Sequence, residues 1–364
     1  MQDMRKKKLL YIMGIDWDWI YQRPQIIEQH LEEDYEVTVI YPRSILDVFH
    51  QKRAAVAKPA RTRILWTLPR QERYQCIGKI ARFLFGGIFR DVNDFDIVIL
   101  GYPLFYRYIP EDYQGRVIYD CMDYHAALYP DAQSVNKLLR QEELLLRKSD
   151  AIVVTAQKLY TEIVKKGIKN QKLYLIRNGT FMTGATAIAY GNEQKELYKI
   201  GYFGTIAEWF DYELLIDSVR KHKNLEYHLI GPEKKKCPEQ NSHIIMEGTV
   251  KNSDLAEYTQ DYDCLIMPFI VNDIVQWVDP VKLYEYIALG KCIICVRYEE
   301  IERFEPYVYM YRDADEYEKL LENLIKQGFP PKYTGEQQQR FLEENSWNQR
   351  FRAWDSVLEN VIRG

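Results

Sequence analysis

The 364-residue sequence lacks the features of membrane-spanning, zinc-binding and disulfide-linked proteins. It contains no run of 18 apolar residues, so we expect no membrane-spanning helix. Its six cysteines have no regular spacing, which in a chain of this length predicts reduced thiols and a cytoplasmic location. Neither the histidines nor the cysteines have zinc-ligand spacing, and no repeat or low-complexity segment occurs. These absences favour an ordinary globular protein without a structural metal.

The N-terminus also lacks a signal-peptide cleavage site. Basic residues 5–8 precede the apolar run Leu9 to Ile15, but Asp16 and Asp18 follow in place of small residues. We therefore predict that this apolar run belongs to the first strand of the fold.

What is present is typical of two α/β domains. The apolar set makes up 47% of the chain and charged residues 28%, and the length suits about two domains. Short β-rich apolar runs alternate with helical patterns, and this alternation stops between Gly179 and Gly191, where glycines and alanines predict a linker. We predict an α/β protein with two Rossmann-like doubly wound domains joined by a linker. The expected domains are residues 1–180, 195–340 and a C-terminal helix in 341–364.

The expected elements fall on both sides of the linker. The first domain has candidate strands at Lys8 to Ile15, Glu36 to Tyr41, Asp96 to Gly101, Arg116 to Tyr119, Ala151 to Thr155 and Leu173 to Ile176, and a helix from Ser134 to Lys148. The second has strands at Tyr198 to Phe203, Glu226 to Ile230, His243 to Met246, Asp263 to Met267 and Lys291 to Val296, and helices at Tyr212 to Lys221, Ser253 to Gln260 and Pro280 to Leu289. An amphipathic helix from Trp347 to Ile362 requires an apolar groove.

Charge is distributed unevenly along the chain. Residues 51–90 contain ten Lys or Arg against the single acid Glu72, a local charge of +9 that leaves −13 for the rest of the chain. Apolar residues alternate with these cations from Ile77 to Arg90, a pattern suited to lying on a membrane. We expect this segment to meet an anionic membrane surface rather than nucleic acid, for which no recognised motif is present. The alternative is a solvated pair of basic helices.

The segment Trp277 to Lys291 carries the most informative motif. Asp279 is the expected N-cap of a helix, Pro280 suits its first position and Gly290 its end. The free amides of Val281 and Lys282 and the helix dipole then form an anion site, where the charge of Lys282 suits a diphosphate. Glu285 lies on the same face and can accept both hydroxyls of a ribose. The alternative is a capped surface helix with an ordinary Lys/Glu pair.

A second set of residues follows the strands of the same domain. Gly204 and Thr205 come directly after the strand Tyr198 to Phe203, where a glycine lets a phosphate approach the backbone closely. Gly201 and Gly204 do not have the spacing of a dinucleotide fingerprint. Gly231, Pro232 and Val250 end or follow neighbouring strands and are expected to line the same pocket.

Candidate residues of the first domain also follow its strands. Asp16-Trp17-Asp18 and Arg23 come after the first strand, where an aromatic face beside carboxylates suits a carbohydrate. The alternative for this segment is a capped turn with a packed tryptophan. Asp123 and His125 follow the strand Arg116 to Tyr119 and are expected to open on the same site. The pattern Asp-x-Asp recurs along the chain, so we treat it as uninformative and predict no required metal.

These motifs resemble those of known enzymes. Asp279 to Lys291, together with Gly201 to Gly204, Asn178-Gly179 and Gly248, resembles the donor half of GT-B glycosyltransferases of family 4. The segments Trp17 to Pro24 and Tyr119 to Asp123 resemble the bacterial subgroup that builds cell-surface polysaccharides such as teichuronic acid.

The resemblance implies an enzyme of a defined kind. It implies a hexosyltransferase that takes a sugar from a nucleoside-diphosphate sugar and needs no further cofactor. The expected acceptor is a lipid-linked glycan at the inner face of the plasma membrane, and the expected transfer retains the configuration of the anomeric carbon. Lys282, Asp123 and His125 are its expected catalytic residues, and Asp123 and His125 are expected to contact the acceptor or the transferred sugar. The acceptor-binding residues are expected to be Asp16, Trp17, Asp18 and Arg23. The resemblance also implies the GT-B fold, in which two Rossmann-like doubly wound domains face a central cleft and the last helix commonly crosses back to the first domain.

One position departs from the pattern. The donor signature has two glutamates, and the first of them falls at Trp277, whereas Glu285 matches the second. Two other functions therefore stay open, a non-catalytic scaffold or sensor that binds nucleotide sugars and a GT-B sugar-nucleotide epimerase.

Overall fold

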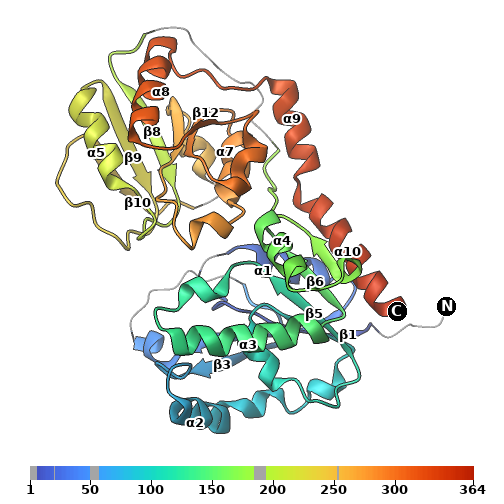
Figure 1. Cartoon of the computed structure of the whole chain (residues 1–364). Helices are drawn as coiled ribbons and strands as arrows, with labels where there is room; N and C mark the ends of the chain where they lie inside the picture. The colour runs from blue at the N-terminus through green and yellow to red at the C-terminus, as the bar shows by residue number, and fades with distance from the viewer. Residues whose placement is uncertain (1–5, 20, 50–56, 184–193, 252–253) are drawn as a thin grey trace. The chain divides into compact units, whose positions relative to one another are not determined.

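Each half of the chain folds around its own parallel sheet in the computed structural model (Figure 1). The structure describes all residues except 1–5, 20, 50–56, 184–193 and 252–253. The chain divides into unit 1, Met1–Arg177 with Phe351–Gly364, and unit 2, Asn178–Arg350. The expected linker residues Gly184 and Gly191 lie outside the described residues, as do Lys52 and Arg53 of the basic segment.

Unit 1 contains a seven-stranded sheet with the order β3-β2-β1-β4-β5-β6-β7. Its strands are β1 (Lys8–Ile12), β2 (Glu36–Ser44), β3 (Thr62–Thr67), β4 (Ile97–Leu100), β5 (Arg116–Cys121), β6 (Ala151–Val154) and β7 (Leu173–Leu175). Its helices are α1 (Arg23–Leu31), α2 (Gln75–Phe85), α3 (Ala132–Lys148), α4 (Gln157–Lys165) and the part of α10 (Trp347–Arg363) that follows Arg350.

Unit 2 contains a six-stranded sheet with the order β10-β9-β8-β11-β12-β13. Its strands are β8 (Tyr198–Phe203), β9 (Leu225–Ile230), β10 (Ile244–Gly248), β11 (Cys264–Met267), β12 (Cys292–Val296) and β13 (Tyr309–Tyr311). Its helices are α5 (Tyr212–Lys221), α6 (Leu255–Tyr258), α7 (Val281–Ala288), α8 (Ala314–Gln327), α9 (Gly335–Glu344) and the first turn of α10.

Both strand orders are those of doubly wound sheets. Every strand pair described is parallel, and successive strands first run toward one edge and then, after a return to the middle, toward the other. Right-handed crossovers in opposite directions place helices on both faces, which explains the fully apolar and buried strands such as β4 and β12. The order reverses between β1 and β4 in unit 1 and between β8 and β11 in unit 2, and ligands of such sheets bind at these switch points. The predicted fold class is confirmed.

Most expected elements are present with small shifts at their ends. The helix expected from Pro280 to Leu289 is α7, but its N-cap is Pro280, so the prediction that Asp279 caps it is wrong. The described part of the basic segment contains helix α2, the 3₁₀ turn Gly86–Phe89 and a strand, β3, that its charge pattern did not indicate. Cys292 and Cys295 are fully buried in β12, as core packing requires. In the described part of the chain, no helix combines the length and the apolar character needed to cross a bilayer.

Candidate functional site

The switch point of the unit 2 sheet carries a lysine held against a glycine. Gly204 follows β8 with a φ of +134°, and a Cβ built on it would lie 2.2 Å from Cε and 2.7 Å from Nζ of Lys282. The Lys282 ammonium lies 5.7 Å from the ring centre of Tyr202, in β8, and 5.6 Å from that of Phe269, just after β11. The lysine of α7 therefore lies beside the carboxyl ends of the two strands that flank the switch point.

Three successive strand ends turn through positive-φ glycines. Gly231, after β9, has a φ of +138°, and its Cβ would lie 2.2 Å from the Gly204 carbonyl oxygen. Gly248, at the end of β10, has a φ of +76° and accepts a 2.6 Å hydrogen bond from the Gly231 amide. Side chains are strained at such φ values, and a Cβ on Gly204 or Gly231 would also clash with a neighbouring residue, which is why glycine suits these positions. Of the other predicted donor residues, the Thr205 and Pro232 carbonyls accept hydrogen bonds within these loops, and Val250 packs on the core.

The electrostatic setting of Lys282 favours an anion. Burial lowers the pKa of Lys282 below that of a free lysine, and nearby Glu285 opposes this shift. Among the described residues, the Lys282 ammonium forms no hydrogen bond and no ion pair. The first amides of α7, which lack partners within the helix, lie one turn or less from the same side chain. A diphosphate could accept hydrogen bonds from both the Lys282 ammonium and these amides.

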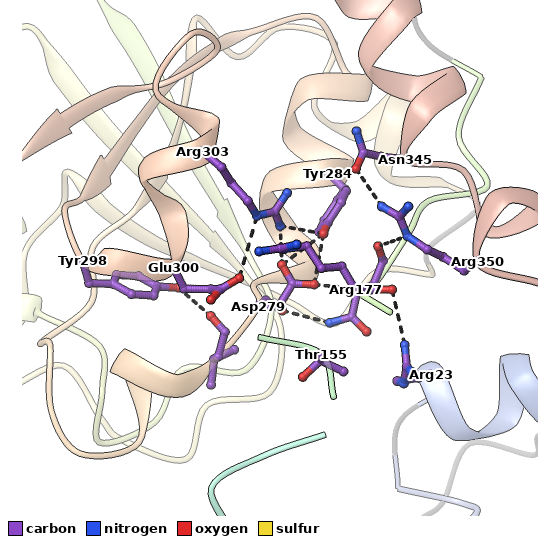
Figure 2. A network of polar contacts seen from close by, with 12 residues as sticks. Arg23, Thr155, Arg177, Asp279, Tyr284, Tyr298, Glu300, Arg303, Asn345 and Arg350 are labelled. Carbon is purple, nitrogen blue, oxygen red and sulfur yellow. Dashed lines mark hydrogen bonds and ion pairs between the residues drawn. The ribbon is translucent and has the colours of Figure 1, made fainter. Parts of the chain in front are cut away.

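A buried polar network fixes the start of α7 (Figure 2). The Asp279 carboxylate, two residues before the helix, accepts hydrogen bonds from the Tyr284 hydroxyl at 3.0 Å and from Arg303. Its other oxygen accepts the Asn178 backbone amide at 2.7 Å. Burial alone would lower the pKa of Arg303, but Asp279 and Tyr284 raise it above its ordinary value. Asp279 is 2% exposed, so it anchors the helix and offers a donor sugar little surface.

The switch point of the unit 1 sheet brings together the other two predicted catalytic residues. Gly14 and Gly101, after β1 and β4, approach so closely that a Cβ on Gly14 would lie 2.7 Å from the Gly101 carbonyl oxygen. His125 stacks edge-on against Tyr102 at 5.1 Å, and its backbone amide donates to the Asp123 carbonyl at 3.0 Å. Asp123 and His125 therefore lie beside this switch point, as the position of β5 predicts.

The titration of this pair follows from burial. Burial lowers the pKa of His125, and Asp123 opposes the shift, so the imidazole is neutral near pH 7. Burial also raises the pKa of Asp123, which His125 opposes. The buried Nε2 of His125 has no hydrogen-bond partner among the described residues. Such an orphaned polar atom is costly unless a ligand or water completes it.

The predicted acceptor residues have structural partners instead. Trp17 is fully buried and donates from Nε1 to the Ala57 carbonyl at 3.2 Å, so the expectation that its face stacks on a sugar is wrong. Asp16 forms a paired hydrogen bond with Arg43 at 2.8 Å, and Asp18 pairs with the same arginine and with a nearby lysine. These contacts fasten the loop after β1, which corresponds to the packed-turn alternative.

Arg23 is likewise buried. It forms an ion pair with Asp120, at the end of β5, at 3.2 Å, and donates from Nη1 to the Arg177 carbonyl at 3.3 Å. Both ion-pair partners are at most 3% exposed. Arg23 is therefore part of the framework of unit 1 and does not present its guanidinium to an acceptor.

Sequence reasoning missed the residues that hold α7 in place. The polar network includes Tyr284, which belongs to α7 itself, and three residues from other parts of the sequence, Asn178, Arg303 and Arg350. Asn178 and Tyr284 lie within recognised motifs, but neither was given this role, and Arg303 and Arg350 belong to no recognised motif. No group of three or more His, Cys, Asp or Glu that could hold a metal ion occurs among the described residues.

Comparison with solved structures places this geometry in a known fold. The apo structure of the lipopolysaccharide outer core galactosyltransferase WaaB superposes with a TM-score of 0.67 at 12% sequence identity. The match covers 96% of this chain and 99% of the WaaB chain. HepE of Anabaena, solved with UDP, matches 97% of this chain and 99% of its own, with a TM-score of 0.66 and 11% identity. The chain has the GT-B glycosyltransferase fold.

One sequence relative agrees with this fold. A protein of Bacillus subtilis strain 168 named as the teichuronic acid biosynthesis glycosyltransferase TuaH is 23% identical over 278 residues, which cover 69% of this chain and 68% of the relative. No family model matches the chain. The resemblance to GT-B glycosyltransferases of the teichuronic acid type is therefore confirmed, and within that fold Lys282 and Gly204 belong to the C-terminal Rossmann-like unit.

Proposed function

We propose that this GT-B protein transfers a hexose-type sugar from a nucleoside-diphosphate sugar to a hydroxyl of a cell-surface glycan precursor. The observation that carries the proposal is the Lys282 ammonium beside Gly204 at the switch point of unit 2, one turn from the free amides of α7. Positive charge, amide donors and an open glycine backbone are what a diphosphate requires. HepE, which has the same fold, binds UDP and UDP-glucose.

In the proposed mechanism the protein acts mainly through electrostatics. Lys282 and the α7 amides stabilise the negative charge that grows on the diphosphate as the sugar leaves. Glu285, one turn further along α7, accepts the ribose hydroxyls. The departing phosphate oxygen takes the acceptor proton in a retaining reaction, so no separate protein base is needed. Because Lys282 and the helix supply the positive charge, we expect no metal requirement.

Unit 1 provides the acceptor side in this proposal. The orphaned Nε2 of His125 donates to or accepts from a substrate hydroxyl, and Asp123 supports it from the same strand end. Burial raises the pKa of Asp123 and so favours its protonated form, in which this carboxyl can also donate a hydrogen bond.

The first experiment is thermal unfolding with UDP, GDP, TDP, ADP and CMP, each with EDTA or Mg²⁺. A ligand at 100 times its Kd stabilises by about 2.7 kcal/mol, enough to shift the Tm by about 2 °C or more. A shift with one nucleoside diphosphate, unchanged by EDTA, supports the site and identifies the base. Lys282→Ala should then lower turnover more than tenfold, whereas Glu285→Ala should chiefly weaken nucleotide binding; wild-type behaviour of both variants refutes the site.

Trp277 keeps a second candidate function open. It lies in the 3₁₀ turn Val275–Trp277, where the donor signature has a glutamate. A non-catalytic nucleotide-sugar sensor would keep the Lys282 site without the chemistry. Binding of UDP-glucose without transfer or slow hydrolysis would favour this function, and conversion of the donor alone to another sugar nucleotide would indicate an epimerase.

The acceptor in the proposal is a lipid-linked glycan, which unit 1 meets at an anionic membrane surface through the basic segment 51–90. Helix α2 of this segment presents apolar side chains to the outside. Phe83 is 87% exposed, and Ile80 and Leu84 are more than half exposed. Their spacing places them on one face with the exposed thiol of Cys76, whereas the buried Ala81 faces the unit.

Exposed cations lie close to this apolar face in the sequence. No ion pair is recorded, among the described residues, for the exposed side chains Arg70, Arg73, Lys79, Arg82 and Arg90. Each basic residue near an anionic leaflet contributes about 1 kcal/mol, and the apolar face adds burial in the interface. Apolar and positively charged side chains on one exposed surface are complementary to an anionic bilayer.

Cys76 allows a direct test, because the other cysteines are buried or half-buried. An environment-sensitive fluorophore on Cys76 should shift to the blue with phosphatidylglycerol vesicles and not with phosphatidylcholine alone, and added salt should weaken the shift. Phe83→Ser with Leu84→Ser should abolish it, whereas Leu144→Ser, an equally polar change at an exposed leucine of α3, should not. No shift with anionic vesicles, or equal shifts in both variants, refutes the membrane surface.

A further inference from the structure

Two backbone connections join the two units. The first is the peptide bond between Arg177 and Asn178, and the second lies inside α10, between Arg350 and Phe351. Any change in the disposition of the units must pass through these connections.

The first connection is held by a charged side chain at each edge of a single peptide. On the unit 1 side, the Arg177 carbonyl accepts a 3.3 Å hydrogen bond from Arg23. On the unit 2 side, the Asn178 amide donates a 2.7 Å hydrogen bond to the Asp279 carboxylate (Figure 2). This carbonyl and this amide belong to the same planar peptide group, which does not rotate internally. A movement of one side chain with its bond intact therefore turns the group that the other side chain holds.

The second connection is fastened to the first. Arg350 donates from Nε to the Asn178 carbonyl at 2.9 Å and from Nη2 to the Asn345 side chain at 2.7 Å. The Asn178 side chain donates to the Asp279 carbonyl at 2.9 Å. A Cβ on Gly179 would lie 3.0 Å from the Asn345 carbonyl oxygen, so the segment after Asn178 packs directly on the approach to α10. Both connections thus enter unit 2 at one polar cluster.

The outer ends of this arrangement reach the two candidate catalytic regions. Arg23 is paired with Asp120, three residues before Asp123 on the strand end that carries His125. Asp279 is bound to Tyr284 and Arg303 and lies two residues before α7, which carries Lys282. A continuous series of covalent bonds and buried or part-buried hydrogen bonds therefore runs from the end of β5 to the start of α7.

We propose that the Arg177–Asn178 peptide couples nucleotide binding at α7 to the connection between the units, with Arg23 and Asp279 as positioning residues. The coupling to nucleotide rests on the proposed donor site. A diphosphate that draws α7 toward itself moves Asp279, and the peptide transmits this movement to Arg23 and Asp120. Neither Arg23 nor Asp279 contacts the donor in this scheme, so both act through other groups.

The test is a double-mutant cycle with UDP as the probe. Arg23→Met and Asp279→Asn should each weaken UDP binding about three- to tenfold in calorimetry, although Arg23 belongs to the other unit. The double variant should bind no more weakly than the weaker single variant, because both act through one peptide. Arg23→Lys, which keeps a donor, should recover most of the affinity. Arg63→Met, which breaks the Arg63–Asp91 ion pair elsewhere in unit 1, should leave it unchanged. Wild-type binding by Arg23→Met, or effects that multiply in the double variant, overturns the coupling.

A ligand-free measurement separates this inference from the proposed function. Hydrogen exchange of the peptides that cover residues 275–290 should be faster in Arg23→Met than in the wild type and unchanged in Arg63→Met. Unchanged exchange in Arg23→Met refutes the mechanical link even if UDP binds. Faster exchange in a protein that binds no nucleoside diphosphate keeps the link and refutes only the donor site.

Discussion

The contact between Gly204 and Lys282 leads to a sharp prediction about donor binding. In Gly204→Ala the new Cβ would lie 2.2 Å from Cε of Lys282, whereas an ordinary contact of this kind is at least about 3.4 Å. The lysine must therefore move by about 1 Å or more, or the loop after β8 must shift. A charge-assisted hydrogen bond to phosphate contributes about 1.5–3 kcal/mol, so its loss weakens nucleotide binding about 10- to 150-fold.

The substitution also strains the backbone, and a control separates the two effects. A side chain at a φ of +134° costs about 1–3 kcal/mol of folding free energy. Gly167 has a φ of +79° and no atom within 4 Å of its Cβ position, so Gly167→Ala strains the backbone without displacing a side chain.

Calorimetric titration with the responsive nucleoside diphosphate and urea unfolding distinguish strain from displacement. Both variants should lose stability, but only Gly204→Ala should lose affinity. Affinity in Gly204→Ala within twofold of the wild type would mean that Lys282 does not bind the diphosphate in the position described.

Three further predictions follow from buried ionisable groups and from the α7 network. Because burial lowers the pKa of Lys282, its positive charge is lost at a lower pH than in free lysine. Nucleotide affinity should therefore fall by up to about tenfold per pH unit above the lowered lysine pKa, and titrations of Lys282→Met should show no such fall below pH 10. Burial, aided by Glu32, raises the pKa of Glu28 to about 8, so the stability that this carboxyl contributes is full below its unfolded pKa of 4.5 and is lost as the pH rises through 8. Above pH 8, the unfolding free energy of Glu28→Gln in urea should exceed that of the wild type by at most about 5 kcal/mol. An equal difference at pH 4 and pH 9 would contradict this. Tyr284→Phe removes a hydroxyl bound to Asp279 and Arg303 and should lower the unfolding free energy by about 1–2 kcal/mol, measured against Tyr174→Phe, whose exposed hydroxyl bonds only a local carbonyl at 3.3 Å.

Local patterns were sufficient for the elements that carry the donor site. The apolar run before Gly204 and the period of the α7 sequence depend on residues adjacent in the chain, so strand β8 and helix α7 could be predicted closely. The end of α7 was also correct, because Gly290 has the positive φ that such a helix end requires. The N-cap was wrong because Asp279 has stronger long-range partners in Arg303 and Asn178 than the amides of its own helix.

The first domain shows where local reasoning failed. The order Asp16-Trp17-Asp18 is equally compatible with a sugar-binding loop and with a packed turn. The outcome depends on Arg43, which the β1–β2 pairing brings beside both carboxylates, and on burial of the indole. Neither can be read from the segment itself.

The sequence by itself determined the α/β class, the two Rossmann-like units, and the residue types that suit a diphosphate, because periodicity, glycine positions and helix signals are properties of short segments. Only the tertiary structure decided which of these residues have interaction partners and which partners they have. It placed Lys282 against Gly204, paired Arg23 with Asp120 and closed Asp279 into a network, because each of these contacts joins residues that are distant in sequence. Whether a charged side chain holds the fold or remains available for a substrate depends on the partners that folding brings to it.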